Sequence, residues 1–208
     1  MTRTAPLDPR PKTPDMNGMT TRSPLDFLLT RRSIPVRMLA APTPDDATLT
    51  RLLTAAARVP DHGKLVPFRF AVLRKAAVDR LARITQEIGT AQGRDPDKLV
   101  KQAQAFLDAP MTVAVICTPR PDTPIPLVEQ EQTAGLACLS LVNAAEAAGF
   151  GGHWLTGWMA RDRDFLRAAL GLEPPMVVAG FVHLGTPKGD PVERPRPDLA
   201  AITDWIET

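Results

Sequence analysis

Apolar positions follow a helical spacing in several stretches of the chain. In the stretch after Thr43, apolar side chains at positions 49, 52, 53 and 56 recur at the i, i+3, i+4 and i+7 spacing of one helix face. Thr43 is a good N-cap residue and Pro44 suits the first helical position, so we expect a helix to begin there. Comparable stretches predict further helices over residues 24–29, 75–88, 96–107, 128–148 and 162–170.

Three other stretches have the pattern of strands. Residues 111–117 form a nearly continuous apolar run, which is typical of a strand buried on both faces. Residues 68–73 and 176–184 are the other two candidates. A few strands among many helices predict an α+β domain, with the strands in its core.

The longest predicted helix, residues 128–148, is rich in small side chains, and Gly149 is a plausible terminator. Small residues let another backbone approach closely. The helix is therefore expected to be either a buried central helix or a helix at a dimer interface. The small residues are Ala134, Gly135, Ala137, Cys138, Ala144, Ala145, Ala147 and Ala148.

Composition narrows the class of protein. With 208 residues, 44% of them hydrophobic, the chain suits one domain, residues 21–208, after a flexible, proline-rich tail over residues 1–20. A net charge of +2 gives no electrostatic case for nucleic acid as a partner. No stretch is apolar enough to span a membrane and no secretory signal precedes the domain, so we expect a soluble cytoplasmic protein. Cys117 and Cys138 are expected to be buried thiols.

Two basic segments are candidates for holding an anion. Arg31, Arg32 and Ser33 follow the first predicted helix, and two guanidinium groups beside a hydroxyl suit a phosphate. Taken alone, the same residues also fit a solvated helix end. Lys188, in a turn after the last strand, is a second candidate with the same alternative.

Two loops carry further candidates. Arg58 and His62 lie in a donor-rich loop between a helix and a strand, a place where binding sites often form. Residues 149–157 are rich in glycine, which allows close approach to a ligand, and Trp154 and Thr156 offer a ring and a hydroxyl. On composition alone, a glycine-rich turn with Trp154 in the core is an equal alternative.

Motifs for other chemistry are missing from the sequence. It has no G-x-S-x-G, no H-E-x-x-H, no P-loop and no dinucleotide G-x-G-x-x-G fingerprint. Its three histidines lack ligand spacing, so no metal site is expected.

The order and spacing of these segments resemble the FMN-dependent nitroreductase family, and most closely a small, compact branch of it. The resemblance runs from about Leu25 to Lys188. It is carried by Arg31-Arg32-Ser33, by residues 58–62, by the strand entry at residues 67–70, by the glycine-rich turn up to Trp154 and by residues 184–187.

The resemblance implies a mostly antiparallel sheet wrapped by helices, in a homodimer that shares two FMN sites at its interface. It implies that NAD(P)H reduces FMN and that FMN reduces a small nitro, quinone or similar acceptor. Hydride chemistry would rest with FMN, so no catalytic side chain is assigned. The residues implied for FMN are Arg31, Arg32, Ser33, Arg58, His62, Trp154, Leu155 and Thr156, to which we add Lys188; those implied for NAD(P)H are Ala144, Ala145, Glu146, Ala147, Ala148 and Gly149.

One departure from the family pattern concerns the acceptor pocket. Many relatives have Gln-Pro-Trp at the strand entry, whereas this chain has Val66, Pro67 and Phe68. A polar donor and an indole are therefore missing. This motivates an alternative reading, a dimer that binds FMN or a nucleotide with little reductase turnover. A further alternative is a helix-rich interaction protein without a cofactor.

Overall fold

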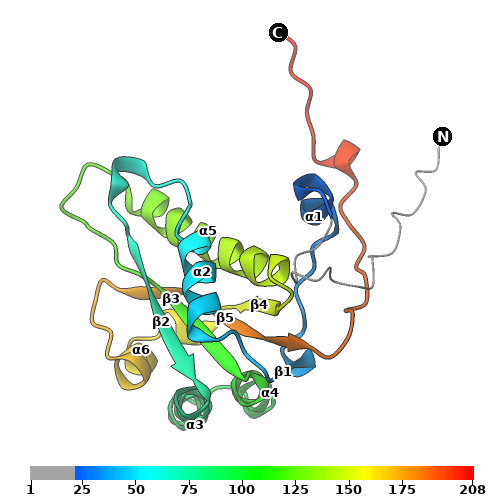
Figure 1. The fold of residues 1–208 in the computed structure, drawn as a ribbon. Helices are drawn as coiled ribbons and strands as arrows, with labels where there is room; N and C mark the ends of the chain where they lie inside the picture. The colour runs from blue at the N-terminus through cyan, green and yellow to red at the C-terminus, as the bar shows by residue number, and fades with distance from the viewer. Residues whose placement is uncertain (1–21) are drawn as a thin grey trace.

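A five-stranded antiparallel sheet forms the centre of the protein (Figure 1). In the computed structural model, residues 22–208 are described, and the predicted tail over residues 1–20 lies outside them. The sheet has the order β1-β5-β3-β2, and β4 pairs with β5. Its strands are β1 (Leu39–Ala40), β2 (Phe68–Arg74), β3 (Met111–Cys117), β4 (Gly151–Leu155) and β5 (Val177–Pro187).

Helices cover both faces of this sheet, and two separate hydrophobic clusters mark the two faces. Alternate residues of β3 enter different clusters: Val113 packs with the α2 and α5 residues, whereas Ala114 packs with those of α3, α4 and α6. The continuous apolar run of β3 follows from this burial on two sides. The helices are α1 (Pro24–Thr30), α2 (Asp46–Ala56), α3 (Lys75–Ala91), α4 (Pro96–Asp108), α5 (Leu127–Ala147) and α6 (Arg163–Leu170).

Most predicted elements are confirmed, with three differences. The predicted helix start at Thr43 and Pro44 is wrong, because the Asp45 carboxylate accepts from Thr48 N at 2.7 Å and α2 begins at Asp46. The strands β1 and β4 were not predicted. β1 has two residues, and β4 begins with a Gly-Gly pair that has the composition of a turn.

Helix α5 is the central helix of one face, as its small residues predict. Ala134, Ala137 and Leu141 are fully buried against the sheet. A Cβ added at Gly152 in β4 would lie 3.2 Å from the Val142 Cα, so helix and strand are in close contact. Leu136 and Leu139, 40% and 39% exposed, project from the other side of the helix.

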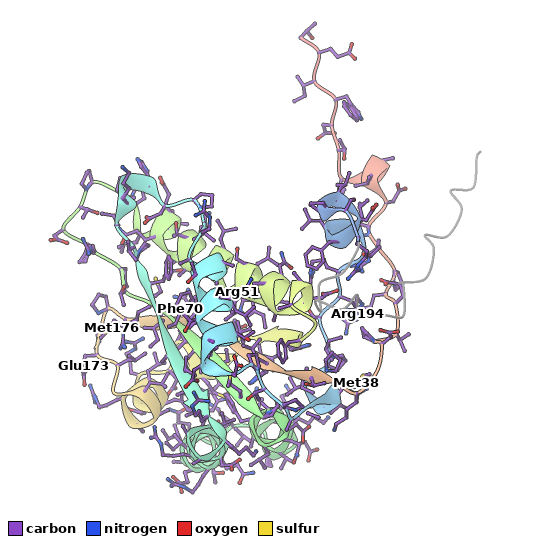
Figure 2. All side chains as sticks on the ribbon, viewed as in Figure 1. Met38, Arg51, Phe70, Glu173, Met176 and Arg194 are labelled. Carbon is purple, nitrogen blue, oxygen red and sulfur yellow. The ribbon has the colours of Figure 1, made fainter. Side chains whose placement is uncertain are left out.

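Within residues 22–208, no helix is long and apolar enough to span a membrane. Cys117 and Cys138 are free and buried, as expected. The C-terminal segment returns past the loop that follows α1, where Arg32 Nη2 donates to Val192 O at 3.0 Å. Arg194 therefore lies on the α1 side of the molecule, away from Glu173 and Met176 (Figure 2).

Candidate functional site

The loop formed by Arg31, Arg32 and Ser33, here called the arginine loop, is held by both α5 and β4. Arg31 caps the C-terminal end of α1, and its backbone N donates to Phe27 O at 2.8 Å. Arg32 N donates to Glu146 Oε2 at 2.9 Å, at the C-terminal end of α5. Ile34 N donates to Gly152 O of β4 at 3.0 Å. The loop conformation is therefore fixed by two elements far away in the sequence.

Arg31 presents one donor that residues 22–208 do not satisfy. Its Nη2 donates to Ser33 Oγ at 3.3 Å, so guanidinium and hydroxyl lie together. Its Nε is buried and has no hydrogen-bond partner among residues 22–208. A buried donor without an acceptor is costly, and an anion beside this loop would remove that cost.

Glu146 supports the arginine loop. It is 8% exposed, and Arg22 Nη2 lies 3.8 Å from its Oε1. Sequence reasoning grouped Glu146 with the candidate NAD(P)H stretch 144–149 and missed its hydrogen bond with Arg32 N, since Arg32 and Glu146 are 114 positions apart. In that stretch, Ala147 and Gly149 are exposed, so part of it faces solvent.

The loop that contains Arg58 and His62, here called the His62 loop, contacts the other end of α5. His62 Nδ1 lies 2.7 Å from Glu129 Oε2, and Thr133 Oγ1 donates to Pro60 O at 3.1 Å. Arg58 and His62 are both exposed.

The two predicted groups of FMN residues therefore lie at opposite ends of one helix. Glu129 and Glu146 are 17 positions apart (146 − 129) in a single α-helix. At 1.5 Å per residue their separation along the axis is about 25 Å. The arginine loop and the His62 loop of one chain cannot close around the same small group.

Trp154 of β4 lies between α5 and β5. Its Nε1 donates to Ala179 O at 3.3 Å, and a Cβ at Gly135 would lie 3.8 Å from its ring. A Cβ at Gly180 would overlap the indole and would lie 2.9 Å from Cys138 Sγ. The indole is thus fixed across Gly180 and 38% exposed, so the alternative of a core Trp154 is wrong. Next to it, Leu155 is half-buried and Thr156 exposed.

A cavity of about 330 Å³, here called the Trp154 cavity, opens beside this indole. Thr156 and Gly157 line it from the end of β4, and Glu131 and Gly135 line it from α5. Arg161, just after the 3₁₀ helix Trp158–Ala160, donates to both Glu131 oxygens at 2.7 and 3.3 Å. Hydrogen bonding to Glu131 raises the pKa of Arg161, so this side chain stays cationic.

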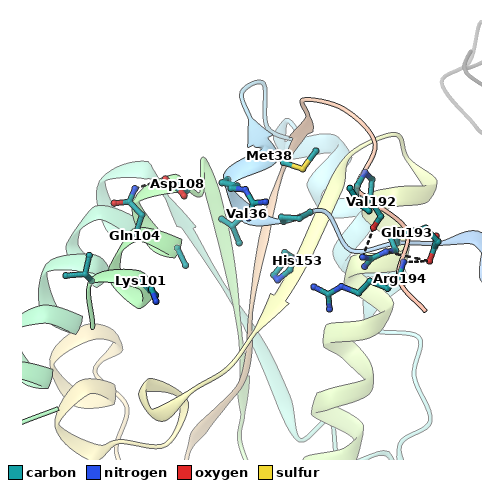
Figure 3. Close-up of a pocket in the computed structure, with 15 residues that line it drawn as sticks. Val36, Met38, Lys101, Gln104, Asp108, His153, Val192, Glu193 and Arg194 are labelled. Atoms are coloured by element: carbon teal, nitrogen blue, oxygen red, sulfur yellow. Dashed lines mark hydrogen bonds and ion pairs between the residues drawn. The ribbon is translucent and has the colours of Figure 1, made fainter. Parts of the chain in front are cut away.

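A larger cavity, of about 750 Å³, lies between α4 and the C-terminal segment (Figure 3). Its wall is rich in cations, because Arg32, Lys101 and Arg194 meet there with the carboxylates of Asp108 and Glu193. In Figure 3, Lys101 and Asp108 of α4 lie on one side of the cavity, and Glu193 and Arg194 of the C-terminal segment lie on the other.

The histidines have structural contacts. His153 Nδ1 lies 2.9 Å from Ile34 O, and burial, with smaller contributions from Arg194 and Arg32, lowers its pKa. His183 is buried beside Thr112 Oγ1, at 2.8 Å, and burial lowers its pKa to about 3. In the described part of the chain, no group of three His, Cys, Asp or Glu residues could hold a metal ion.

Lys188 and the strand entry at residues 66–68, where the sequence departs from the family pattern, lie outside the groups of residues described above. Lys188 Nζ donates to Arg37 O at 3.1 Å, next to β1. Phe68 is 8% exposed and packs edge-on against Phe70 at 5.5 Å between ring centroids. Val66 is 58% exposed, at the end of the His62 loop.

Comparison with known proteins agrees with this arrangement of elements. The model of the Nitroreductase family matches residues 28–186. YdjA of Escherichia coli (strain K12), named "Putative NAD(P)H nitroreductase", is 32% identical over 164 residues, or 79% of this chain and 88% of YdjA. A protein of the same name from Haemophilus influenzae is 34% identical over 164 residues, 78% of this chain and 87% of that protein.

Two solved structures show the same fold. A nitroreductase-like family protein from Bacillus cereus has a TM-score of 0.75 at 19% identity, over 91% of this chain and 98% of that one. A Desulfovibrio desulfuricans protein solved in complex with FMN has a TM-score of 0.71 at 24% identity, over 90% of this chain and 99% of that one.

The fixed position of Trp154 gives a direct test of the site geometry. We expect Gly180→Ala to displace the indole, because the new Cβ would overlap it, and to lower the free energy of unfolding by about 1–3 kcal/mol. Near-UV circular dichroism and urea unfolding measure the two effects. Gly189→Ala is the control, since nothing lies within 4 Å of its Cβ position. An unchanged near-UV spectrum in Gly180→Ala would contradict the described packing.

Proposed function

The chain belongs to the nitroreductase family, and from this premise we propose that it is an FMN-dependent NAD(P)H oxidoreductase that reduces a small oxidised acceptor. When bound, FMN supplies the hydride chemistry, taking hydride from NAD(P)H at N5 and delivering it to a nitro, quinone or similar group. The protein's part is to bind the two nucleotides, orient them and admit the acceptor.

The observation that carries the proposal is the buried, unsatisfied Nε of Arg31 in the arginine loop. Arg31 and Ser33 converge on one point, and the buried Arg31 Nε lacks an acceptor among residues 22–208. A phosphate offers acceptors to both a guanidinium and a hydroxyl. We assign the FMN phosphate to Arg31 and Ser33, with Arg32 beside them. Lys188 remains a further cationic candidate.

The rest of the FMN site requires a second copy of the chain. Arg58 and His62 lie at the end of α5 opposite the arginine loop. A twofold axis that crosses two α5 helices antiparallel brings one end of each helix to the opposite end of its partner. We therefore propose a homodimer in which Arg58 and His62 of the partner subunit complete each site.

The surface supports such a dimer. Leu136 and Leu139 on the outer side of α5 are about 40% exposed, and Leu25, Leu28 and Leu29 of α1 are exposed by 65%, 57% and 55%. Exposed large apolar side chains such as these favour an interface between subunits.

Trp154, Leu155 and Thr156 then lie beside the flavin ring. They follow the part of β4 that anchors the arginine loop, so ring and phosphate contacts belong to one continuous segment of structure. Residues 144–149 precede the same strand and are assigned to NAD(P)H. The buried free thiols fit a reducing compartment, and we place the enzyme in the cytoplasm.

The first test is an absorption spectrum of the purified protein, recorded without oxygen before and after addition of NADH or NADPH. We expect flavin bands that bleach, because reduced flavin loses its visible absorption. Bands that persist with both nucleotides would favour the alternative of an FMN-binding dimer with little turnover. A protein that takes up no FMN would contradict the proposal.

The phosphate assignment predicts the effect of one substitution. Arg31→Ala should weaken FMN binding by about 1.5–3 kcal/mol, the range for a hydrogen bond to a charged group, which is roughly 10- to 150-fold in Kd. Titration of the apoprotein with FMN, followed by flavin fluorescence, measures the change. The control is Arg83→Ala, which removes an exposed arginine of α3 that bonds Glu87. Equal affinities in both variants would exclude the phosphate role.

A further inference from the structure

We propose that the acceptor binds in the Trp154 cavity and that the Glu131–Arg161 ion pair on its wall restricts it to uncharged planar molecules. The inference rests on the proposed function, since it assumes that FMN lies beside Trp154 and Thr156. It adds the binding place and the chemical class of the acceptor.

The volume and lining of the cavity suit one small ring system beside the flavin. Its volume, about 330 Å³, is at the lower end of the range for small-molecule pockets. The Trp154 indole is fixed as one wall by Gly180 and Ala179, and Val177 and Val178 add apolar surface. An aromatic molecule can therefore stack or pack there without losing hydrogen bonds.

The only charged side chains that line this cavity, within residues 22–208, are Glu131 and Arg161. Two hydrogen bonds, 2.7 and 3.3 Å, join these side chains, and their opposite charges compensate each other. Cys117 adds no charge, because burial, together with the nearby Glu131, raises the pKa of its thiol to about 11. The wall is therefore polar but electrically neutral.

A charged acceptor would disturb this balance. A carboxylate would have to lie beside Glu131 or displace it from Arg161, and an ammonium group would meet the reverse problem. An uncharged nitro or quinone group needs no such rearrangement, and its partly negative oxygens can approach Arg161. Because the side chains of Arg161 and Glu131 are 64% and 41% exposed, water screens the discrimination and keeps it moderate.

The test uses nitroaromatic probes of equal size and different charge. For each, one hydride and one proton convert the nitro group to nitroso and water, and one NAD(P)H is oxidised. We compare 4-nitrobenzamide, which is neutral, with the 4-nitrobenzoate anion and the 4-nitrobenzylammonium cation. In the unmodified protein, kcat/KM should be highest for the neutral probe.

Glu131→Gln leaves Arg161 without its counter-charge. The kcat/KM ratio of 4-nitrobenzoate to 4-nitrobenzamide should then rise about fivefold or more, the factor that a unit charge at about 4 Å exerts even in bulk water. Arg161→Gln should lower that ratio and raise the ratio for the cation. The matched control is Glu87→Gln, which breaks an ion pair on α3 in which Arg83 Nη1 donates to both Glu87 oxygens at 2.7 and 2.9 Å, and which should leave all ratios unchanged.

Flavin content and anaerobic bleaching by NAD(P)H are measured for every variant, so that the two proposals fail separately. A protein that binds no flavin, or is not bleached, contradicts the proposed function. If flavin is bound and bleached but neither variant changes the ratios relative to Glu87→Gln, the acceptor inference is overturned. If Glu131→Gln does not fold, Arg161→Gln decides the question. A lowered kcat/KM ratio of 4-nitrobenzoate to 4-nitrobenzamide then supports the inference, and an unchanged ratio overturns it.

Discussion

The rigid length of α5 is the constraint on which the rest of the site depends. One end of this 21-residue helix binds the arginine loop through Glu146, and the other end binds the His62 loop through Glu129. A helix cannot shorten, so these two anchored loops stay about 25 Å apart within one chain. If both groups serve one FMN, they must come from two chains. The proposed dimer is therefore a consequence of how two loops dock on one helix.

Glycines allow close packing around the middle of α5 and the Trp154 indole. Gly135 on the helix and Gly180 on β5 leave space for the Trp154 indole, and Gly152 brings β4 against the helix. Gly135 also lines the Trp154 cavity, together with Ala179 of β5. The small residues of α5 therefore contribute both to the hydrophobic core, through Ala134 and Ala137, and to the wall of the Trp154 cavity, through Gly135.

Periodicity predicted the helices and the three longer strands because these elements bury regular apolar faces. It did not predict β4, since Gly151 and Gly152 look like a turn until the close contacts of Gly151 with Leu39 and of Gly152 with Val142 are known. The candidate segments of the site were also named from the sequence, and their roles stay predictions. The arrangement of these segments was not predicted, because it depends on contacts such as Arg32–Glu146 and His62–Glu129, which join residues 114 and 67 positions apart. The Glu131–Arg161 pair, 30 positions apart, lies in neither motif and carries no sequence signal.

The central claim, that each FMN site is shared between two subunits, is tested most directly with hybrid dimers. One chain carries Arg31→Ala and Ser33→Ala, the other carries Arg58→Ala and His62→Ala, and different affinity tags isolate the mixed dimer. Each parent homodimer has two damaged sites, whereas a shared site gives the hybrid one intact site and one that lacks all four side chains. The account predicts that the hybrid regains one tight FMN site per dimer. A hybrid that binds FMN no more tightly than either parent would contradict it.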